Sequence, residues 1–295
     1  MTATSDVPRA GRVEAPAVVR TRAELRNLLA TLPRPIGLVP TMGWLHAGHR
    51  SLIHRSRAEN ATTVVTNFVN PKQFNSPEDL ARYPRDEGRD LAIMAEEGVD
   101  VVFAPHVDEV YPPGSETVVS VGRLAGVLEG AARPGHFDGV ATVVTILFNA
   151  VGADVAYFGQ KDAQQVMVIS RMARDLGIAT RVIPCPTVRE QDGLALSSRN
   201  ALLSPEQRAA APVVHLGLLS ALDLWLEGER SAEALRAEMR RVLAGEPLAE
   251  PEYVSVASLE PGRELKELDF VGGPALLSTA VRFGEIRLID NERID

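Results

Sequence analysis

Short apolar runs alternate with helix-like segments through the first two thirds of the chain. The apolar runs are rich in β-branched residues and stop at polar, glycine or proline positions, as buried strands do. They cover residues 36–40, 62–71, 99–104, 154–159 and 179–184. Helix-like segments lie between them, at residues 48–58, 84–98, 139–151 and 162–176. This alternation predicts an α/β fold with a parallel sheet that is covered by helices on both faces.

The pattern changes in the last third of the chain. Ser204 is placed as a helix N-cap, with Pro205 at the first helical position. A further helix-like segment and two strand-like runs follow, at residues 232–243, 253–258 and 275–288. The second run has a break near Gly284. We therefore expect a flexible leader, a larger α/β domain and a smaller α+β domain, at residues 1–16, 17–188 and 189–295.

Charge and cysteine content argue against some classes of function and leave others open. The chain has 31 Lys and Arg against 39 Asp and Glu, a net charge of −8, so bulk charge gives no reason to expect nucleic-acid binding. Cys185 is the single cysteine of the sequence, which excludes an intrachain disulfide and fits a cytoplasmic protein. No secretory signal and no apolar run of about 18 residues is evident, so no membrane association is expected.

Two histidines stand where the first predicted strand passes into a helix. His46 and His49 are three residues apart and fall on one face of the first helical turn. Gly43 can adopt backbone angles that other residues avoid, and Gly48 lets a ligand approach the backbone. The free N–H groups of a helix N-terminus suit a phosphate. These features favour phosphate binding over a zinc site, which lacks an evident third ligand, and over two helix-capping histidines.

Three further polar blocks follow predicted strands or short loops. Lys161 and Asp162 stand at a strand-to-helix junction, where Lys161 offers a cation to phosphates and Asp162 is also a candidate helix cap. Gln164 and Gln165 follow in the first helical turn and offer uncharged amides. The third block is the run Ser197, Ser198 and Arg199, whose hydroxyls and guanidinium suit a polyphosphate, although a solvated loop would look similar.

The fourth block comes directly after a predicted buried strand. Asn70 and Gln73 offer amides that would orient a small polar acid, whereas Arg82 and Arg85 are more typical of a surface. His136 precedes an apolar helix and is expected to be structural. Because ligands of parallel sheets bind beyond the carboxyl ends of the strands, the four blocks are expected to meet at one edge.

Together these blocks resemble the pantothenate synthetase (pantoate–β-alanine ligase) family. The resemblance rests on "PTMGWLHAGH", "FVNPKQF", "YFGQKDAQQ" and "DGLALSSRN", with "RPGHFDGV" and "RLIDN" in agreement. It implies a Rossmann-like N-terminal domain that binds ATP and pantoate, a C-terminal lid domain and a homodimer. The implied reaction joins pantoate to β-alanine through a pantoyl adenylate and releases pyrophosphate and AMP.

The resemblance also assigns residues to the site. Implied ATP-binding residues are Met42, Gly43, Trp44, Leu45, His46, Ala47, Gly48, His49, Gly159, Gln160, Lys161, Asp162, Val188, Leu196, Ser197, Ser198 and Arg199. Implied substrate-binding residues are Gln73 and Gln165, to which Asn70 is added from its position after a predicted strand, and His49 is the family's assigned proton donor. Gln160 and Leu196 depart from the family's common glutamate and methionine.

The expected chemistry is electrostatic. Negative charge develops on the α-phosphoryl oxygens and the leaving pyrophosphate, and His46, His49, Lys161 and Arg199 are expected to stabilise it. Mg²⁺ would be held mainly by the ATP phosphates, with no dedicated protein metal site. Two rivals are an adenylyltransferase that joins a nucleotide to a cofactor precursor, and a binding module without catalysis.

Overall fold

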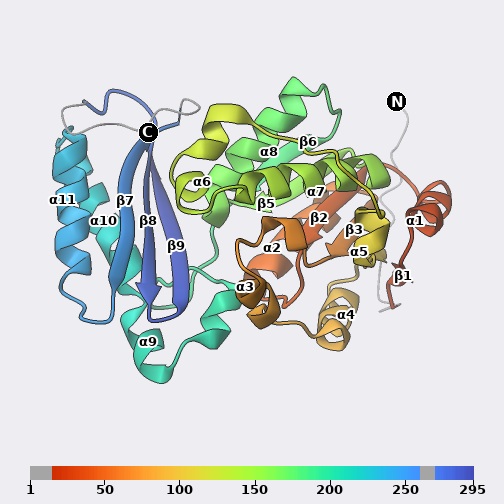
Figure 1. Ribbon diagram of the computed structural model, residues 1–295, viewed down its shortest axis with the longest axis horizontal. Coiled ribbons are helices and arrows are strands. Elements are labelled where there is room, and N and C mark those ends of the chain that lie inside the picture. Colours follow the sequence, from red (N-terminus) through yellow and green to blue (C-terminus); the bar gives the residue numbers. More distant parts are fainter. Residues whose placement is uncertain (1–14, 260–269) are drawn as a thin grey trace, which may run out of the picture.

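A six-stranded parallel sheet forms the larger part of the molecule in the computed structural model, which describes residues 15–259 and 270–295 (Figure 1). Its strands are β1 (Ala17–Val19), β2 (Ile36–Thr41), β3 (Thr62–Asn67), β4 (Val101–Phe103), β5 (Val155–Gly159) and β6 (Arg181–Cys185). They lie in the order β1-β4-β3-β2-β5-β6. The chain winds outward from β2 on one side and from β5 on the other, so the β2–β5 border is the switch point where ligands of such sheets bind.

The predicted α/β class is confirmed, with small shifts of the element ends. The helices of this part are α1 (Arg22–Leu29), α2 (Ala47–Glu59), α3 (Pro77–Arg82), α4 (Glu87–Glu96), α5 (Val107–Val110), α6 (Glu129–Ala132), α7 (His136–Val151) and α8 (Ala163–Asp175). Short 3-10 helices are η1 (Pro71–Gln73), η2 (Gly122–Gly126) and η3 (Gln160–Asp162). The sequence analysis did not predict β1 or α1, and α7 begins three residues earlier than expected.

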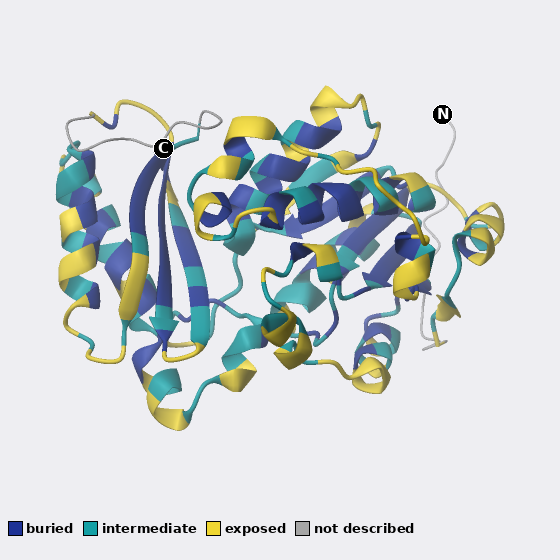
Figure 2. Cartoon of the chain, in the orientation of Figure 1, coloured by how far each residue is buried: buried dark blue, intermediate teal, exposed yellow. Residues whose placement is uncertain are grey.

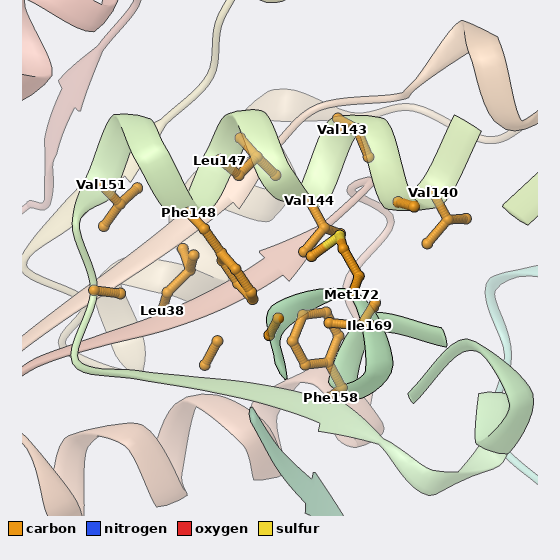
Figure 3. Packing of buried hydrophobic residues seen from close by; sticks show 14 of the residues in the cluster. Leu38, Val140, Val143, Val144, Leu147, Phe148, Val151, Phe158, Ile169 and Met172 are labelled. Atoms are coloured by element: carbon orange, nitrogen blue, oxygen red, sulfur yellow. The ribbon is translucent and has the colours of Figure 1, made fainter. Parts of the chain in front are cut away.

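The sheet separates two apolar cores because successive strand residues point to opposite faces. Leu38 and Val64 lie in the core that is closed by α1, α7 and α8. Val39 and Val65 lie in the core that is closed by α2 and α4. Figure 3 shows the side chains of α7 packed around Leu38 and Phe158. Figure 2 shows that the inner strands of the sheet are buried, whereas the edge strands β1 and β6 are partly exposed. The sheet is thus a rigid base for the loops at its edge.

A second, antiparallel sheet follows in the C-terminal part. Its strands are β7 (Glu250–Ser258), β8 (Ala275–Phe283) and β9 (Ile286–Ile294), in that order. The break predicted near Gly284 is the tight β8–β9 turn, where Gly284 has φ 59°. The elements between the two sheets are η4 (Ser198–Leu202), α9 (Pro205–Ala210), α10 (Val213–Leu226) and α11 (Ala232–Leu243). Helices α10 and α11 pack on this sheet around a separate apolar core that includes Leu218 and Val256.

The stretch Pro205–Leu226 is long and apolar enough, by composition, to cross a membrane. The sequence analysis, which counted uninterrupted apolar runs, did not find it. In the structure the stretch divides into α9 and α10 near Pro212, and Leu218 and Ala221 of α10 are fully buried in the C-terminal core. One face of α10 therefore packs in the C-terminal core, whereas Leu216 and Leu226 on the same helix are exposed.

The segment that connects the two parts of the molecule runs from the end of β6 to the start of α9. Separate apolar cores lie on its two sides. The domain ends given above, 17–188 and 189–295, stay a prediction. Of the predicted leader at 1–16, residues 1–14 lie outside the described residues.

Candidate functional site

A cleft opens beyond the carboxyl ends of β2, β3, β5 and β6. Its walls include most of the residues that the sequence predicted: Met42, His46, Gly48, His49, Asn70, Gln73, Gly159, Lys161, Asp162, Gln165, Val188, Leu196, Ser197, Ser198 and Arg199. The four sequence blocks, which are spread over more than half of the chain, thus meet at one place. This convergence was the strongest structural expectation of the sequence analysis, and the structure has it.

Five of the residues that the sequence assigned to ATP do not line the cleft: Gly43, Trp44, Leu45, Ala47 and Gln160. Gly43 has φ 83°, and a Cβ there would lie 2.7 Å from Asn67 Oδ1. The backbone N–H groups of Trp44 and Leu45 both donate to the buried Asp90 carboxylate, at 2.8 Å each. These contacts shape the turn before α2. A direct contact of the five residues with ATP stays a prediction.

The two histidines form the N-terminal cap of α2. His46 is the N-cap residue, and its Nδ1 accepts a hydrogen bond from Gly48 N at 3.2 Å. The Nδ1 of His49 accepts one from His46 N at 3.3 Å. The rings lie 4.1 Å apart, centroid to centroid, and both line the cleft. Capping therefore does not exclude ligand binding, which the sequence analysis treated as its alternative, and ligand binding by the two rings stays a prediction.

Both imidazoles are neutral in the folded protein. Burial, with help from the Lys161 ammonium, lowers the pKa of His46 to about 4. Burial, repulsion from His46 whenever that ring is protonated, and the Lys161 ammonium hold the pKa of His49 well below its usual value. Because each Nδ1 accepts a backbone N–H, the single ring proton must be on Nε2. Each ring can therefore present one neutral N–H donor to a ligand in the cleft.

Lys161 is placed by the turn η3 at the end of β5. Its Nζ lies 3.8 Å from an Asp162 oxygen. The backbone carbonyls of Gln160 and Lys161 accept hydrogen bonds from Asn291 Nδ2 of β9, at 3.1 and 2.8 Å. Asp162, a candidate cap of α8, makes no side-chain capping hydrogen bond. A strand of the C-terminal sheet thus supports the backbone that carries the cleft's lysine.

The Ser197–Arg199 block lies opposite, on η4. Ser198 Oγ donates to the Trp44 carbonyl at 3.3 Å, and Ser197 Oγ accepts from Arg199 N at 3.2 Å. The Arg199 guanidinium pairs with Asp79 of α3, at 3.1 Å. The block is therefore held by contacts to the turn before α2 and to α3, and Arg199 must leave or share Asp79 to bind a phosphate.

The three glutamines that the sequence offered as amide ligands differ in their contacts. Gln73 and Gln165 line the cleft, and the Gln165 amide forms no hydrogen bond with the described residues. Gln164 points away and is structural, because its amide bonds the backbone of Leu124, Val127 and Glu129.

Arg82, which the sequence analysis considered a surface residue, pairs with Glu285 outside the cleft.

Two residues to which the sequence gave no role in the site, Arg133 and His136, also line the cleft. His136 is the first residue of α7, is buried, lines the cleft and contacts the Gln73 carbonyl through Nδ1 at 2.8 Å. The Arg133 guanidinium also lines the cleft, donates to the Gln73 carbonyl at 3.2 Å and forms no ion pair with any described residue. Burial and the Arg199 charge lower its pKa. The block "RPGHFDGV" was the signal that could have identified both residues.

Metal-ligating side chains are sparse. Among residues 15–259 and 270–295, no group of three or more His, Cys, Asp or Glu side chains is arranged to hold a metal ion. Within this described part, Asp162 is the only carboxylate that lines the cleft. Any protein ligand for a cation on a bound phosphate would therefore come mainly from Asp162.

A parallel sheet of this topology, with histidines at a helix N-terminus and cations around a cleft at the switch point, is the architecture of nucleotide-binding α/β enzymes. A family model described as Pantoate-beta-alanine ligase matches residues 17–293. The chain therefore belongs to the pantoate-beta-alanine ligase family, as its motifs predicted.

Relatives and solved structures agree with this assignment. The chain is 56% identical to the pantothenate synthetase of Roseiflexus castenholzii over 274 residues, which cover 93% of this chain and 98% of the relative. A pantothenate synthetase structure from Thermus thermophilus has TM-score 0.87 and 48% identity, covering 94% of this chain and 98% of its own. A pantoate-beta-alanine ligase from Francisella tularensis, complexed with beta-gamma ATP and beta-alanine, has TM-score 0.76 and 34% identity, covering 94% and 97%.

Proposed function

We propose that this ligase uses ATP to condense pantoate with β-alanine, through a pantoyl adenylate, to give pantothenate, AMP and pyrophosphate. The observation that carries the proposal is the convergence of His46, His49, Lys161 and Arg199 on one cleft. In the first step a pantoate carboxylate oxygen attacks the α-phosphorus and the bond to pyrophosphate breaks. In the second step the β-alanine amine attacks the acyl carbon and AMP leaves.

The first step needs hydrogen-bond donors and positive charge at the α-phosphoryl group and at the leaving pyrophosphate. His46 and His49 supply Nε2–H donors that are already oriented by the α2 cap, and Lys161 supplies the charge. Oriented donors of this kind contribute about 10²–10³ in rate each. Arg199 joins them when a phosphate replaces Asp79 as its partner. Mg²⁺ enters with ATP and is held mainly by the phosphates, with Asp162 as the nearest protein carboxylate.

The pantoate site lies deeper in the cleft. Pantoate has a carboxylate, two hydroxyls and a branched carbon that carries two methyl groups. The amides of Gln73 and Gln165 suit the hydroxyls and add no charge to the site. Val143, Val144 and Leu147 of α7 form an apolar wall that suits the methyl groups. Such a pocket, apolar with a few placed polar groups, is typical of small-ligand sites.

The β-alanine carboxylate requires a cation that the phosphates do not use. Arg133 meets this requirement, because its half-buried guanidinium forms no ion pair with a carboxylate of the described residues. A buried charge is costly unless a counter-ion compensates it, so a cation in this state is suited to an anionic ligand. Arg133 would hold the carboxylate end and leave the amine free to reach the acyl group.

Lid closure and assembly belong to the same proposal. The acyl adenylate must be kept from water, and residues 189–295 are the segment that could close over it. The assignments as homodimer and as cytoplasmic enzyme follow from the family resemblance. Analytical ultracentrifugation of the purified chain would test the dimer.

A coupled assay for AMP tests the reaction. With ATP and pantoate alone we expect pantoate-dependent exchange between pyrophosphate and ATP but little AMP; adding β-alanine should release AMP and pantothenate in equal amounts. A product that retains AMP covalently, without need of an amine, would instead indicate an adenylyltransferase of a cofactor precursor. Absence of pyrophosphate release under all conditions would indicate a binding module.

A further inference from the structure

Three buried polar side chains form a chain of hydrogen bonds that ends at the cleft. Tyr111 follows α5, whereas Asn70 is the N-cap of η1 and Gln73 is its last residue, so residues 41 positions apart are joined. Tyr111 Oη donates to Asn70 Oδ1 at 2.8 Å, and Asn70 Nδ2 donates to Gln73 Oε1 at 2.9 Å. Asn70 and Gln73 line the cleft, but Tyr111 does not.

The Asn70 amide has no hydrogen-bonding capacity left for a substrate. An amide side chain has two donor hydrogens and two acceptor lone pairs. Both hydrogens are used, by Gln73 Oε1 and by the Gly139 carbonyl at 3.1 Å. Both lone pairs are used, by Tyr111 Oη and by Lys72 N at 3.3 Å. Asn70 therefore acts on the substrate only through Gln73, although the sequence assigned it to the substrate directly.

The direction of these bonds determines which end of the Gln73 amide meets a ligand. Oε1 faces Asn70 and accepts from it, so Nε2 is left as the donor end, without a partner among the described residues. If the amide were reversed, Nε2 would face the Nδ2 donor of Asn70, and two donors would oppose each other. The site therefore offers a donor to an acceptor atom of the acid.

Tyr111 is the outer end of this chain. Its hydroxyl is protonated because burial raises its pKa. A hydroxyl can donate or accept, so the direction of the Asn70 amide is set by Lys72 N, which can only donate, and by the Gly139 carbonyl, which can only accept. Tyr111 Oη then donates to the Oδ1 that faces it. Its bond to Oδ1 is 0.5 Å shorter than that of Lys72 N, by the distances 2.8 and 3.3 Å. Tyr111 thus supplies the closer of the two donors that hold Asn70 in this orientation.

We propose that Tyr111 is a positioning residue for the acid substrate: through Asn70 it keeps the donor end of the Gln73 amide directed at pantoate. The inference rests on the proposed function, because it takes Gln73 as a pantoate contact. It predicts an effect on pantoate and none on ATP, since the chain of bonds leads only to Gln73.

The test is the variant Tyr111→Phe, which removes one oxygen and keeps the ring. We expect the KM for pantoate to rise about 3- to 10-fold, the range for one net hydrogen bond, with the KM for ATP unchanged. The matched control is Tyr157→Phe. Tyr157 is also buried and its hydroxyl also bonds an asparagine, Asn60, but it lies outside the cleft. It should leave both KM values unchanged.

A double-mutant cycle separates positioning from general loosening. Gln73→Ala alone should raise the KM for pantoate, and in that background Tyr111→Phe should add nothing further. Equal effects in both backgrounds, or an unchanged KM in Tyr111→Phe, would overturn the positioning role while the proposed function stands. If Gln73→Ala itself leaves pantoate binding unchanged, the proposed acid site is wrong, and the role of Tyr111 falls with it.

Discussion

Replacing His46 by asparagine would separate the two tasks that its ring performs. Nδ1 caps α2 by accepting from Gly48 N, whereas Nε2 is free to donate to a phosphate. Asparagine is among the best N-cap residues, so His46→Asn should preserve the cap. The shorter side chain cannot reach the position of Nε2. The variant should therefore fold normally and lose only the donor.

The expected effects on stability and on the rate of adenylation differ clearly in size. A cap that is lost outright costs about 0.5–2 kcal/mol, and a cap that asparagine replaces should cost close to nothing. Loss of one oriented donor in a transition state costs about 2.7–4 kcal/mol, or about 10²–10³ in rate. His46→Asn should therefore lower the rate of adenylation by at least about 100-fold and leave the free energy of unfolding nearly unchanged.

Pantoate-dependent exchange between pyrophosphate and ATP measures adenylation without the second step, and urea unfolding measures stability. His49→Gln is the companion variant, because glutamine at the third helical position of a capping box also bonds the N-cap backbone. It should show the same separation of rate from stability. A His46→Asn enzyme that exchanges pyrophosphate at the unaltered rate would refute the reasoning, since capping would then be the ring's whole contribution.

Three further predictions concern Lys161, the ion pair of Arg287 with Glu129, and the dependence of stability on pH. Lys161→Ala should lower the exchange rate by about 100-fold or more with the fold intact, and unchanged turnover would remove it from the mechanism. Arg287→Gln leaves Glu129 buried without its partner, at present 2.7 Å away, and should lower the free energy of unfolding in urea by about 3–5 kcal/mol. Because burial lowers the pKa of both His46 and His136 to about 4, the unfolded chain binds more protons below pH 6.5. Stability should therefore fall from pH 6.5 toward 4, and equal unfolding free energies at pH 7 and 5 would contradict this.

The parts of the fold that the sequence predicted are those with strong local patterns. Buried strands such as residues 36–40 carry apolar side chains on both faces, and glycine or proline marks their ends. The helix α1 was missed even though Thr21 and Glu24 form a capping box, because a helix of 8 residues gives a short periodic signal. The strand β1 has three residues at the sheet edge, too few for any pattern.

The site was predictable as far as its residues occur in compact motifs. His46, His49 and Lys161 follow predicted strands, and the rule for parallel sheets brings them together. Arg133 and His136 were underrated because each precedes an apolar helix in a manner typical of ordinary loop residues. What distinguishes them is that both line the cleft, with His136 buried and Arg133 in no ion pair with a described residue, and these are properties of the folded chain.

Longer-range support was beyond any sequence pattern. Asn291 stands 130 residues from Lys161, yet its amide bonds the Lys161 carbonyl and that of the preceding residue. A lysine that stabilises developing charge must hold its position without reorganising, because preorganisation is what makes such a group effective. Strand β5 of the first sheet ends at this turn. The backbone carbonyls of the turn are held by Asn291 of β9, which belongs to the second sheet. The lysine that we propose as the catalytic cation is therefore positioned jointly by both sheets, so displacement of the C-terminal sheet would disturb the proposed phosphate site as well as open it.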